Sequence, residues 1–398
     1  MKILMVNKFL YPRGGAETYV FRLRDLLSSR GHEVQYFGME DERNLLGNEL
    51  GLAASSMDLQ AGIRKNLLAP LRIIYSREAY RKMLKLLETF QPDVLHLNNI
   101  QFYLTPSVIL AAQHYREERD RHLRIVYTAH DYQLLCPRHD LLDTKMRPCE
   151  CCLDGTYFHC LRGKCMKHSY LKSFLGMVDA FVWAHSKAYD AIDTILCPSN
   201  FIKEKLDTQE RFRWKTRTLH NVIPASKPKQ AEKENYVLYF GRLTKEKGTL
   251  TLLQAARKLP EIRFVFAGNG EMAKDIRAVP NAEYVGFRSG EELELLIRKA
   301  KFSVCPSEWY ENCPYSVLES QMLGTTVIGS RMGGIPELIR HGENGLLFEA
   351  GNVEQLKECI EKLWYDEELL KRCSQKCKSI QWETEDSYYE KLLAIYRE

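Results

Sequence analysis

Short apolar runs alternate with amphipathic stretches along the chain, and the alternation restarts once. The first series of apolar runs is "KILMVN", "HEVQYFG", "DVLHLNN", "RIVYTAH" and "ILCPSN". The second series is "YVLYFG", "RFVFAGNG", "AEYVGF", "FSVCPS" and "TTVIGS", and a helical segment follows each of its runs. Strands that alternate with helices indicate parallel sheets covered by helices. The pattern therefore predicts an α/β protein with two doubly wound sheets.

The restart of the pattern divides the chain into two domains. It falls between residues 205 and 224, and we place the boundary after residue 210. The expected first domain is 1–210 and the second is 211–380, followed by an amphipathic helix within 381–398 whose packing the pattern does not determine. A chain of 398 residues is long enough for two such domains. Ligands of doubly wound sheets bind beyond the carboxyl ends of the strands, so we expect functional residues in the loops that follow strands.

The composition narrows the class of protein. Hydrophobic residues make up 45% of the chain and charged residues 27%, which is typical of a soluble globular protein. No apolar run is long enough to span a membrane, and the first one breaks at Pro-Arg-Gly-Gly, unlike a signal peptide. We therefore expect a cytoplasmic protein. The net charge of +5 is weak support for any partner, and we expect no nucleic acid.

The stretch "ENCPYSVLE" carries a glutamate at each end, Glu311 and Glu319. Two such carboxylates could form an acid–base pair, bind a metal, or accept hydrogen bonds from a molecule with many hydroxyls. Pro314 is well placed to begin a helix that runs to Gly324, with Glu311 just before it and Glu319 two turns in. An ionised carboxylate can accept from both hydroxyls of a vicinal diol. The alternative is one solvent-facing glutamate and one acid favoured by the helix dipole.

Two loops after second-half strands carry further candidates. "YFGRLTKEKG" places Arg242 and Lys247 where a glycine-bounded loop opens a helix, which suits a diphosphate. The alternative is two solvated basic residues. "FAGNGEM" places Gly268 and Gly270 where a nucleotide could approach the backbone, although a lone Gly-x-Gly is weak support.

In combination and in this order, several stretches resemble the retaining glycosyltransferases of family 4. The stretches are "RGGAE", "TAHD", "GRLTKEKG", "VGF", "ENCPYSVLE" and "GGIPELI", and together they cover essentially the full chain. The resemblance implies the GT-B fold, in which two Rossmann-like domains face each other across a cleft. It also implies transfer of a sugar from a UDP- or GDP-sugar to a glycan acceptor.

The resemblance assigns roles to individual residues. It implies that Arg242 and Lys247 grip the donor diphosphate and stabilise it as the leaving group. Glu311 would accept hydrogen bonds from the transferred sugar, Glu319 would hold the ribose diol, and His130 would lie near the reacting sugar. The remaining residues implied to contact the donor are Gly14, Gly15, Gly268, Phe287, Arg288, Pro314, Tyr315, Ser316 and Val317.

The implied reaction needs positioning and charge stabilisation more than a metal. No convincing Asp-x-Asp motif is present, so we expect no catalytic metal. The expected acceptor is a lipid-linked saccharide in surface polysaccharide synthesis. The rival functions are a sugar-nucleotide 2-epimerase, a phosphorylase-like relative and a non-catalytic sugar-nucleotide-binding subunit. The presence of Arg242, Lys247, Glu311 and Glu319 together argues against the non-catalytic subunit.

Six of the twelve cysteines crowd between residues 136 and 165, in an insertion of about 136–168 within the first domain. Cys149 and Cys152 form a C-x2-C pair, and Cys160 and Cys165 form a wider pair; the four could close a structural zinc site. Spare ligands within the same segment are Cys136, Cys151 and His159. Free thiols, a redox disulfide and an iron–sulfur cluster are the alternatives.

Residues 63–85 form a basic stretch that includes apolar residues. Between Arg64 and Lys85 it has seven Lys or Arg residues and one acid, Glu78. Such a segment can lie on an anionic membrane surface, and Pro70 favours two short helices over one. The alternative is a core-packing helix with a solvated face.

Overall fold

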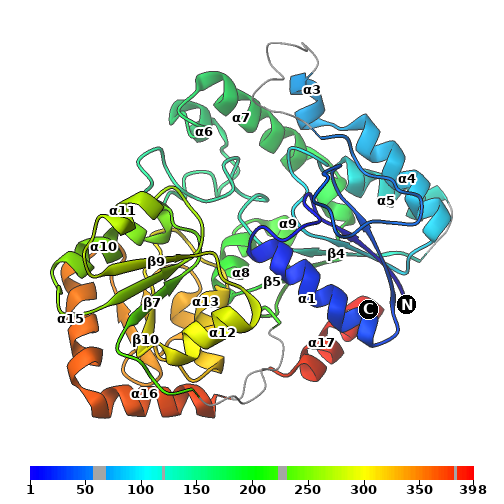
Figure 1. The fold of residues 1–398 in the computed structure, drawn as a ribbon. Coiled ribbons are helices and arrows are strands. Elements are labelled where there is room, and N and C mark those ends of the chain that lie inside the picture. The colour runs from blue at the N-terminus through cyan, green and yellow to red at the C-terminus, as the bar shows by residue number, and fades with distance from the viewer. Residues whose placement is uncertain (57–68, 119–121, 223–230, 381–382) are drawn as a thin grey trace. The chain divides into compact units, whose positions relative to one another are not determined.

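The computed structural model describes residues 1–56, 69–118, 122–222, 231–380 and 383–398. The chain divides into two compact units, which are described separately. Unit 1 comprises Met1–Lys145, Cys149–Val222 and Thr384–Glu398, and unit 2 comprises Met146–Pro148 and Ile223–Glu383. Figure 1 shows that parallel strands and their covering helices build both units.

The sheet of unit 1 has six strands in the order β2-β1-β3-β4-β5-β6, all paired in parallel. The order reverses between β1 and β3, so the loops after these two strands flank the switch point of the sheet, where doubly wound proteins bind ligands. The strands are β1 (Lys2–Val6), β2 (Glu33–Phe37), β3 (Val94–Leu97), β4 (Arg124–Thr128), β5 (Thr194–Cys197) and β6 (Thr216–Thr218). The helices are α1 (Gly15–Ser29), α3 (Ala69–Ile74), α4 (Arg77–Phe90), α5 (Ser107–Glu118), α6 (Phe158–Arg162), α7 (Tyr170–His185), the 3-10 helix η1 (Ala188–Ala191), α8 (Asn200–Asp207), α9 (Glu210–Arg213) and α17 (Glu385–Arg397).

The sheet of unit 2 has six parallel strands in the order β12-β11-β10-β7-β8-β9. Its order reverses between β7 and β10, which places a second switch point beside their carboxyl ends. The strands are β7 (Val237–Phe240), β8 (Phe264–Ala267), β9 (Ala282–Gly286), β10 (Phe302–Cys305), β11 (Val327–Ser330) and β12 (Gly345–Phe348). The helices are η2 (Lys245–Lys247), α10 (Thr249–Arg257), α11 (Ala273–Arg277), α12 (Gly290–Lys299), α13 (Tyr315–Met322), α14 (Ile335–Leu338), α15 (Val353–Tyr365) and α16 (Glu367–Ser379).

The predicted α/β organisation with two doubly wound parallel sheets is confirmed, and each sheet has one edge strand that the pattern did not reveal. β6 is three residues long and reads "TRT", which gives too little periodic signal to be predicted. β12 follows the turn sequence "HGEN" and begins with a glycine, so it reads as part of a loop. Because β6 pairs with β5, unit 1 continues to Val222 and the boundary lies later than residue 210.

The final helix, α17, packs on unit 1, beside α1 in Figure 1. Its Tyr388 and Tyr396 are buried in the same core as the strands of unit 1. The hydroxyl of Tyr388 donates to that of Tyr19 at 3.0 Å, and the hydroxyl of Tyr396 lies 2.5 Å from Nδ1 of the buried His96. The helix therefore completes the first core rather than the second, which precedes it in the chain.

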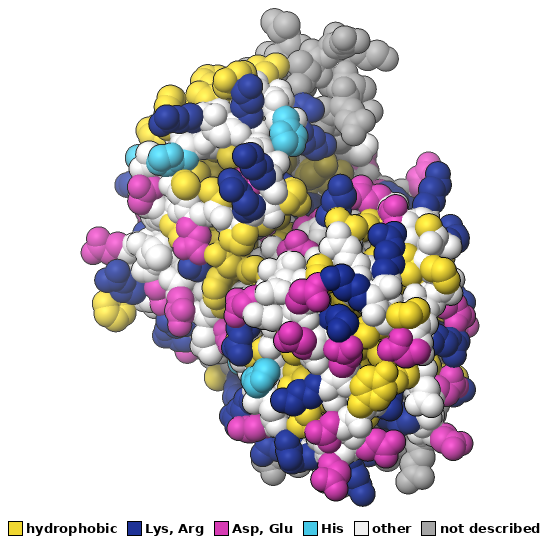
Figure 2. Space-filling model, turned by 90° about the vertical axis from the view of Figure 1, so that its left-hand side faces the viewer, with side chains coloured by type: hydrophobic (Ala, Val, Ile, Leu, Met, Phe, Trp, Pro, Cys, Tyr) yellow, Lys and Arg dark blue, Asp and Glu magenta, His cyan; other side chains and the backbone are white. Residues whose placement is uncertain are grey.

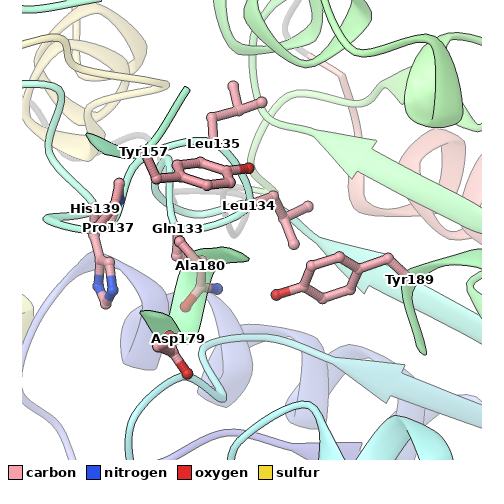
Figure 3. Close-up of a pocket in the computed structure, with 9 residues that line it drawn as sticks. All are labelled: Gln133, Leu134, Leu135, Pro137, His139, Tyr157, Asp179, Ala180 and Tyr189. Atoms are coloured by element: carbon pink, nitrogen blue, oxygen red, sulfur yellow. The ribbon is translucent and has the colours of Figure 1, made fainter. Parts of the chain in front are cut away.

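Helix α7 is held to unit 1 by the side chains on its inner face. The indole N–H of Trp183 donates to the carbonyl of Ile74 at 2.9 Å, and the ring of Trp183 stacks on that of Tyr75. Asp179 lies one turn before Trp183 and lines the small pocket of Figure 3 together with Gln133, His139, Tyr157 and Tyr189. Asp179 is 6% exposed and its Oδ1 has no hydrogen-bond partner in the described structure. Burial raises the pKa of this carboxyl to about 7.

The raised pKa of Asp179 makes the stability of unit 1 fall as the pH rises. The unfolded chain loses the proton near pH 3.8, whereas the folded chain keeps it to about pH 7. The loss in the free energy of unfolding caused by the buried carboxyl therefore grows between these two pH values and is constant above them. Asp179→Asn removes the titrating group. We expect it to raise the free energy of unfolding by on the order of 2 to 4 kcal/mol at pH 8 and by much less at pH 4.

Urea unfolding of wild type and variant at several pH values measures this difference. Asp25→Asn, a change at an exposed aspartate of the same unit, is the control for the lost charge. If the difference in the free energy of unfolding between Asp179→Asn and wild type does not change with pH, the raised pKa of Asp179 is contradicted.

Candidate active site

The predicted basic and acidic residues of unit 2 meet at its switch point. Lys247 ends the short η2 turn that follows β7, and Glu311 lies in the loop that follows β10, the neighbouring strand. Their side chains form an ion pair with Nζ 2.6 Å from Oε1. The side chain of Glu311 is 10% exposed and that of Lys247 is 20% exposed. The pair therefore joins the two loops in a largely desolvated position.

Glu311 is held in its ionised form. Burial alone would raise its pKa, but the charge and hydrogen bond of Lys247, together with the hydroxyl of Ser307, lower the pKa below its ordinary value. Ser307 donates to the same Oε1 at 2.7 Å, and its own carbonyl accepts from the hydroxyl of Ser330 at 2.6 Å. Glu311 is therefore a fixed anion at the end of β10.

Both predicted cations lie against Trp309. Nζ of Lys247 is 4.5 Å from the centroid of its ring, and Cζ of Arg242 is 5.4 Å from it. Arg242 is half exposed and lies 4.0 Å from Glu246, so its guanidinium remains accessible. The indole supports two positive charges without neutralising them, and an anion can still reach both. Sequence reasoning missed Trp309, which lies between two motif residues and has no motif signal of its own.

Two glycines fix this arrangement because a side chain would not fit. At Gly248, which has φ +71°, an added Cβ would lie 1.8 Å from the carbonyl oxygen of Pro306, so the loops after β7 and β10 can approach only with glycine there. At Gly333, which has φ +60°, a Cβ would lie 2.1 Å from the carbonyl oxygen of Glu311. The neighbouring Gly334 donates its N–H to that same oxygen at 2.7 Å. The "GGIPELI" stretch thus positions the backbone of Glu311.

The other residues predicted for the donor site also follow strands of unit 2. Helix α13 begins at Tyr315 with Pro314 as its N-cap, and Ser316 and Val317 lie in its first turn. The helix ends at Met322 rather than Gly324, so Glu319 is its fifth residue, one turn in rather than two, and is partly buried.

The remaining positions follow β8 and β9. A Cβ on Gly268 would lie 1.8 Å from the carbonyl oxygen of Gly241, so this glycine has a packing role between two loops. Phe287 and Arg288 follow β9; Phe287 is 61% exposed, and the guanidinium of Arg288 donates to the carbonyl of Phe287 at 3.0 Å.

In unit 1, His130 follows β4 and is oriented by Asn98, which follows β3. Nε2 of His130 lies 2.8 Å from Oδ1 of Asn98, whose amide donates to the carbonyl of Val6 at 3.2 Å. Because that donation fixes the amide orientation, Oδ1 must accept, and Nε2 must carry the proton. Burial lowers the pKa of His130 to about 3, so the imidazole is neutral near pH 7.

The glycine loop after β1 leads into a second polar group of unit 1. Gly14 is the N-cap of α1 and Gly15 its first residue, and neither has a left-handed φ. Glu17, in the first turn, is buried and accepts from Asn7 Nδ2 at 3.2 Å, while Asn7 Oδ1 accepts from the backbone N–H of Asn99 at 3.1 Å. Sequence reasoning missed Asn7, Asn98, Asn99 and Glu17, although polar residues directly after buried strands are a signal that could have found them.

Three of the four predicted zinc ligands, Cys152, Cys160 and Cys165, lie in one cluster. Cys152 and Cys160 are buried in one small cluster with Cys165 packed against it, and Cys149 is partly exposed. The thiols of Cys160 and Cys165 share a hydrogen bond that lowers the pKa of Cys165. Among the described residues, no group of three or more His, Cys, Asp or Glu side chains is placed to hold a metal ion. The zinc site therefore stays a prediction.

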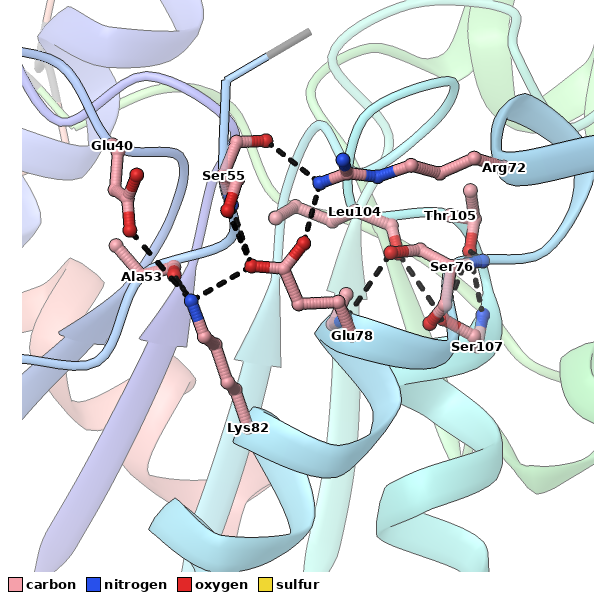
Figure 4. A network of polar contacts seen from close by, with 11 residues as sticks. Glu40, Ala53, Ser55, Arg72, Ser76, Glu78, Lys82, Leu104, Thr105 and Ser107 are labelled. Carbon is pink, nitrogen blue, oxygen red and sulfur yellow. Dashed lines mark hydrogen bonds and ion pairs between the residues drawn. The ribbon is translucent and has the colours of Figure 1, made fainter. Parts of the chain in front are cut away.

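The predicted basic stretch of residues 63–85 is described only in part. Residues 63–68 lie outside the described residues, and the apolar Met83 of α4 is buried in the core. Figure 4 shows Arg72 and Lys82 converging on Glu78, with Lys82 Nζ 2.8 Å from its Oε1. From 72 to 85 the stretch thus belongs to two helices, α3 and α4, with ion pairs on Glu78 from both of them, and α4 packs against the core. No helix in the described part of the chain is long and apolar enough to cross a membrane.

Similarity to known proteins covers the whole chain. Residues 13–227 match the family described as "Glycosyltransferase Family 4", and residues 224–379 match the one described as "Glycosyl transferases group 1". A GDP-mannose-dependent alpha-mannosyltransferase of Corynebacterium glutamicum is 24% identical over 100% of this chain and 88% of that protein. An uncharacterized 42.6 kDa protein in the cps region of Klebsiella pneumoniae is 24% identical over 85% of this chain and 88% of that protein.

Two further matches differ in extent. An uncharacterized glycosyltransferase of Methanocaldococcus jannaschii is 30% identical over 45% of this chain, and this chain spans only about half, 52%, of that protein. The crystal structure of Anabaena HepE in complex with UDP superposes with a TM-score of 0.67 over 99% of both chains, at 16% identity. At that identity the likeness shows a shared fold.

Removal of Lys247 should reverse the pH dependence of the contribution that Glu311 makes to the stability of unit 2. In wild type, the lowered pKa of Glu311 contributes stability that is present above the ordinary carboxyl pKa and is lost as the pH falls through the lowered value. In Lys247→Met, burial dominates and raises the pKa, so the unpaired Glu311 destabilises the fold as the pH rises. We expect a loss of about 3 kcal/mol relative to wild type at pH 7, shrinking towards pH 4.

Urea unfolding of both proteins from pH 4 to pH 7 tests this expectation. Lys245→Met, in the same turn but with an exposed side chain, is the matched control and should change stability little. A Lys247→Met loss that is equal at both ends of the pH range would show that the pair does not set the ionisation of Glu311.

Proposed function

Because the chain belongs to glycosyltransferase family 4 and is a transferase with the GT-B fold, we propose that it moves a sugar from a nucleoside diphosphate to a glycan with retention of anomeric configuration. The observation that carries the proposal is the buried Lys247–Glu311 pair beside Arg242 at the switch point of unit 2. A cation pair and a fixed anion on adjacent loops suit a ligand with a charged diphosphate next to neutral hydroxyls.

In the proposed reaction, the bond between the anomeric carbon and the diphosphate oxygen breaks, and the diphosphate leaves with the electron pair. Arg242 forks onto the phosphate oxygens and Lys247 acts as a point charge. Lys247 has three N–H donors and uses one on Glu311, so donors remain for the phosphate. Stabilising charge that develops on the leaving group is a direct route to faster transfer.

Glu311 serves as a hydrogen-bond acceptor that positions the sugar. Ser307 and Lys247 both donate to Oε1, and Oε2 is proposed to accept a hydrogen bond from a sugar hydroxyl. The acceptor hydroxyl attacks on the face from which the diphosphate departs, and an oxygen of the departing phosphate takes its proton. No side-chain base is required in this scheme, and Glu319 is proposed to hold the ribose diol.

His130 of unit 1 is proposed to contact the reacting sugar as a neutral group. Its Nε2–H is donated to Oδ1 of Asn98, which fixes the orientation of the ring. A neutral imidazole adds no positive charge near the forming oxocarbenium-like carbon. Gly14 and Gly15 are proposed to bring backbone close to the donor phosphates.

Donor and acceptor are proposed from the relatives. HepE binds UDP and UDP-glucose in its crystal structures, and the corynebacterial relative uses GDP-mannose, so the proposed donor is a UDP- or GDP-sugar. The Klebsiella relative lies in a cps region, which supports a lipid-linked saccharide acceptor in surface polysaccharide synthesis. A sugar-nucleotide 2-epimerase would act on the donor alone, and a non-catalytic subunit would bind it without turnover.

Donor turnover should depend on Lys247 and Glu311 and not on a divalent metal. Purified protein, offered a panel of UDP- and GDP-sugars with EDTA present, is expected to release nucleoside diphosphate from one donor. Lys247→Ala and Glu311→Gln should each lower that release by about a hundredfold or more, because each removes a contact to the leaving group or the sugar. The measurement is nucleoside diphosphate release, with thermal unfolding to verify the fold of each variant.

Lys245→Ala is the control, since it alters the charge of the same turn without touching Glu311. Full turnover in both Lys247→Ala and Glu311→Gln would rule out this active site. Conversion of the donor to an isomer without release of diphosphate would favour the epimerase.

The cysteine segment is proposed to hold a structural zinc, on the strength of its C-x2-C spacing and the clustering of Cys152, Cys160 and Cys165. We expect about one zinc per chain by elemental analysis of protein purified without chelator. Cys152→Ser should release the metal while Cys197→Ser, at a buried cysteine on β5, should retain it. A zinc content of zero in wild type would remove the proposal.

A further inference from the structure

The hairpin of α6 and α7 carries an exposed apolar surface that the active site does not use. We call it the α6–α7 surface, and its members are between 40% and 61% exposed: Phe158, Tyr170, Leu171, Phe174, Phe181 and Val182. In Figure 2, yellow hydrophobic side chains lie between blue and cyan basic ones over the upper part of the visible face, where α6 and α7 run. Exposed apolar patches of this kind mark interaction sites.

Helix α7 has an exposed apolar face, and on its other side the partly buried Met177, Ala180 and Ala184 pack against the cluster of Cys152, Tyr157 and Cys160. At about 100° per residue, its exposed members fall within roughly 120° of the helix circumference. Its buried members, Ser173, Gly176, Asp179 and Trp183, occupy the opposite side. A helix with one apolar face has that face satisfied by the core, so the second apolar face of α7 requires another explanation.

The surroundings of this surface are cationic. Residues 158–187 contain five Lys or Arg and three His, and their single acid is Asp179. Asp179 is buried on the inner face of α7 and cannot offset these charges at the surface. None of the five lysine and arginine side chains, Arg162, Lys164, Lys167, Lys172 and Lys187, forms an ion pair in the described part of the chain.

The hairpin holds this surface in a fixed orientation. Lys164 lies over the ring of Tyr170 with Nζ 4.2 Å from the centroid, which ties the connecting loop to the first turn of α7. A Cβ on Gly176 would lie 3.2 Å from Cγ of Met166, so the loop packs closely against the helix. With Trp183 anchored to Ile74 on the inner face, the outer face is a built feature of unit 1.

We propose that the α6–α7 surface docks unit 1 onto an anionic membrane. Aromatic and aliphatic side chains of α7 would enter the boundary between headgroups and acyl chains, while the surrounding lysines and arginine contact anionic headgroups. A helix lying in the interface needs one apolar face and a cationic border, and α7 has both. The proposal does not depend on sugar transfer, and it differs from membrane binding through residues 63–85, where Met83 is buried.

Charge complementarity favours a membrane over a protein partner. A protein surface that matched this one would need an apolar centre enclosed by acids, whereas any anionic leaflet offers both features without a specific sequence. Lys164 on Tyr170 places a cation beside an amphipathic ring, as expected where headgroups meet acyl chains.

The test is co-sedimentation of the full-length chain with vesicles of phosphatidylcholine containing roughly one third phosphatidylglycerol, compared with phosphatidylcholine alone. We expect binding to the anionic vesicles only, reduced when salt rises from about 0.1 M to about 0.5 M. Phe174→Ser combined with Phe181→Ser should weaken binding at least about tenfold, because two aromatic side chains that would be buried in the membrane are lost. Lys167→Glu combined with Lys172→Glu should also weaken it.

The matched control combines Leu45→Ser with Leu295→Ser, which removes two exposed apolar side chains elsewhere and should leave binding unchanged. Circular dichroism and thermal unfolding verify that each variant is folded. No binding of wild type to anionic vesicles, equal binding to neutral vesicles, or full binding by Phe174→Ser/Phe181→Ser would each overturn the proposal. None of these outcomes bears on donor turnover, which is measured without vesicles.

Discussion

The ion pair between Lys247 and Glu311 is the constraint on which the proposed donor site depends. It spans the two loops that flank the reversal of strand order in unit 2, so the topology of the sheet decides that these residues meet. A buried charge is costly unless it is paired and hydrogen-bonded, and here Lys247 and Ser307 both donate to Glu311, while Gly333 allows a close approach to the backbone of Glu311. Lys247 keeps further N–H donors for a phosphate. Stability and the proposed chemistry therefore use the same side chains.

Unit 1 builds its switch point mainly from amides and an imidazole, with one buried acid, Glu17, hydrogen-bonded to Asn7. Asn98 orients His130, and Asn7 joins the loop after β1 to the loop after β3 through the backbone of Asn99. Neutral amides and a neutral imidazole suit sugar hydroxyls, whereas the ionic groups of unit 2 suit a diphosphate. The two sheets also share a Cys-Pro-Ser sequence after a strand, but its serine caps a helix at Ser199 and binds the acid at Ser307. The switch points of the two sheets thus differ in charge because of a few residues that follow their strands.

Sequence reasoning recovered the sheets and the charged residues because both have strong local signals. Buried strands give continuous apolar runs, and Lys247 and Glu311 lie in motifs whose order is specific. It failed where the local signal is weak or absent: β6 has three residues, β12 begins with a glycine after a turn, and the packing of α17 on unit 1 depends on Tyr396 reaching His96, which is 300 residues earlier. Trp309 has no motif signal of its own. Its contacts with Arg242 and Lys247 are visible only once the loops are assembled.

The α6–α7 surface shows the limit of hydrophobic pattern most clearly. A helix with apolar residues around most of its circumference is ordinarily interpreted as a core helix, and hydrophobicity alone does not separate the inner face of α7 from its outer one. Trp183 makes the distinction in the folded chain, because its indole N–H donates to the carbonyl of Ile74 and holds that side of the helix inward. Phe174 and Phe181 then lie on the outer face, where the proposed anionic membrane would cover them. The contact that fixes the inner face thus determines which side chains the outer face presents.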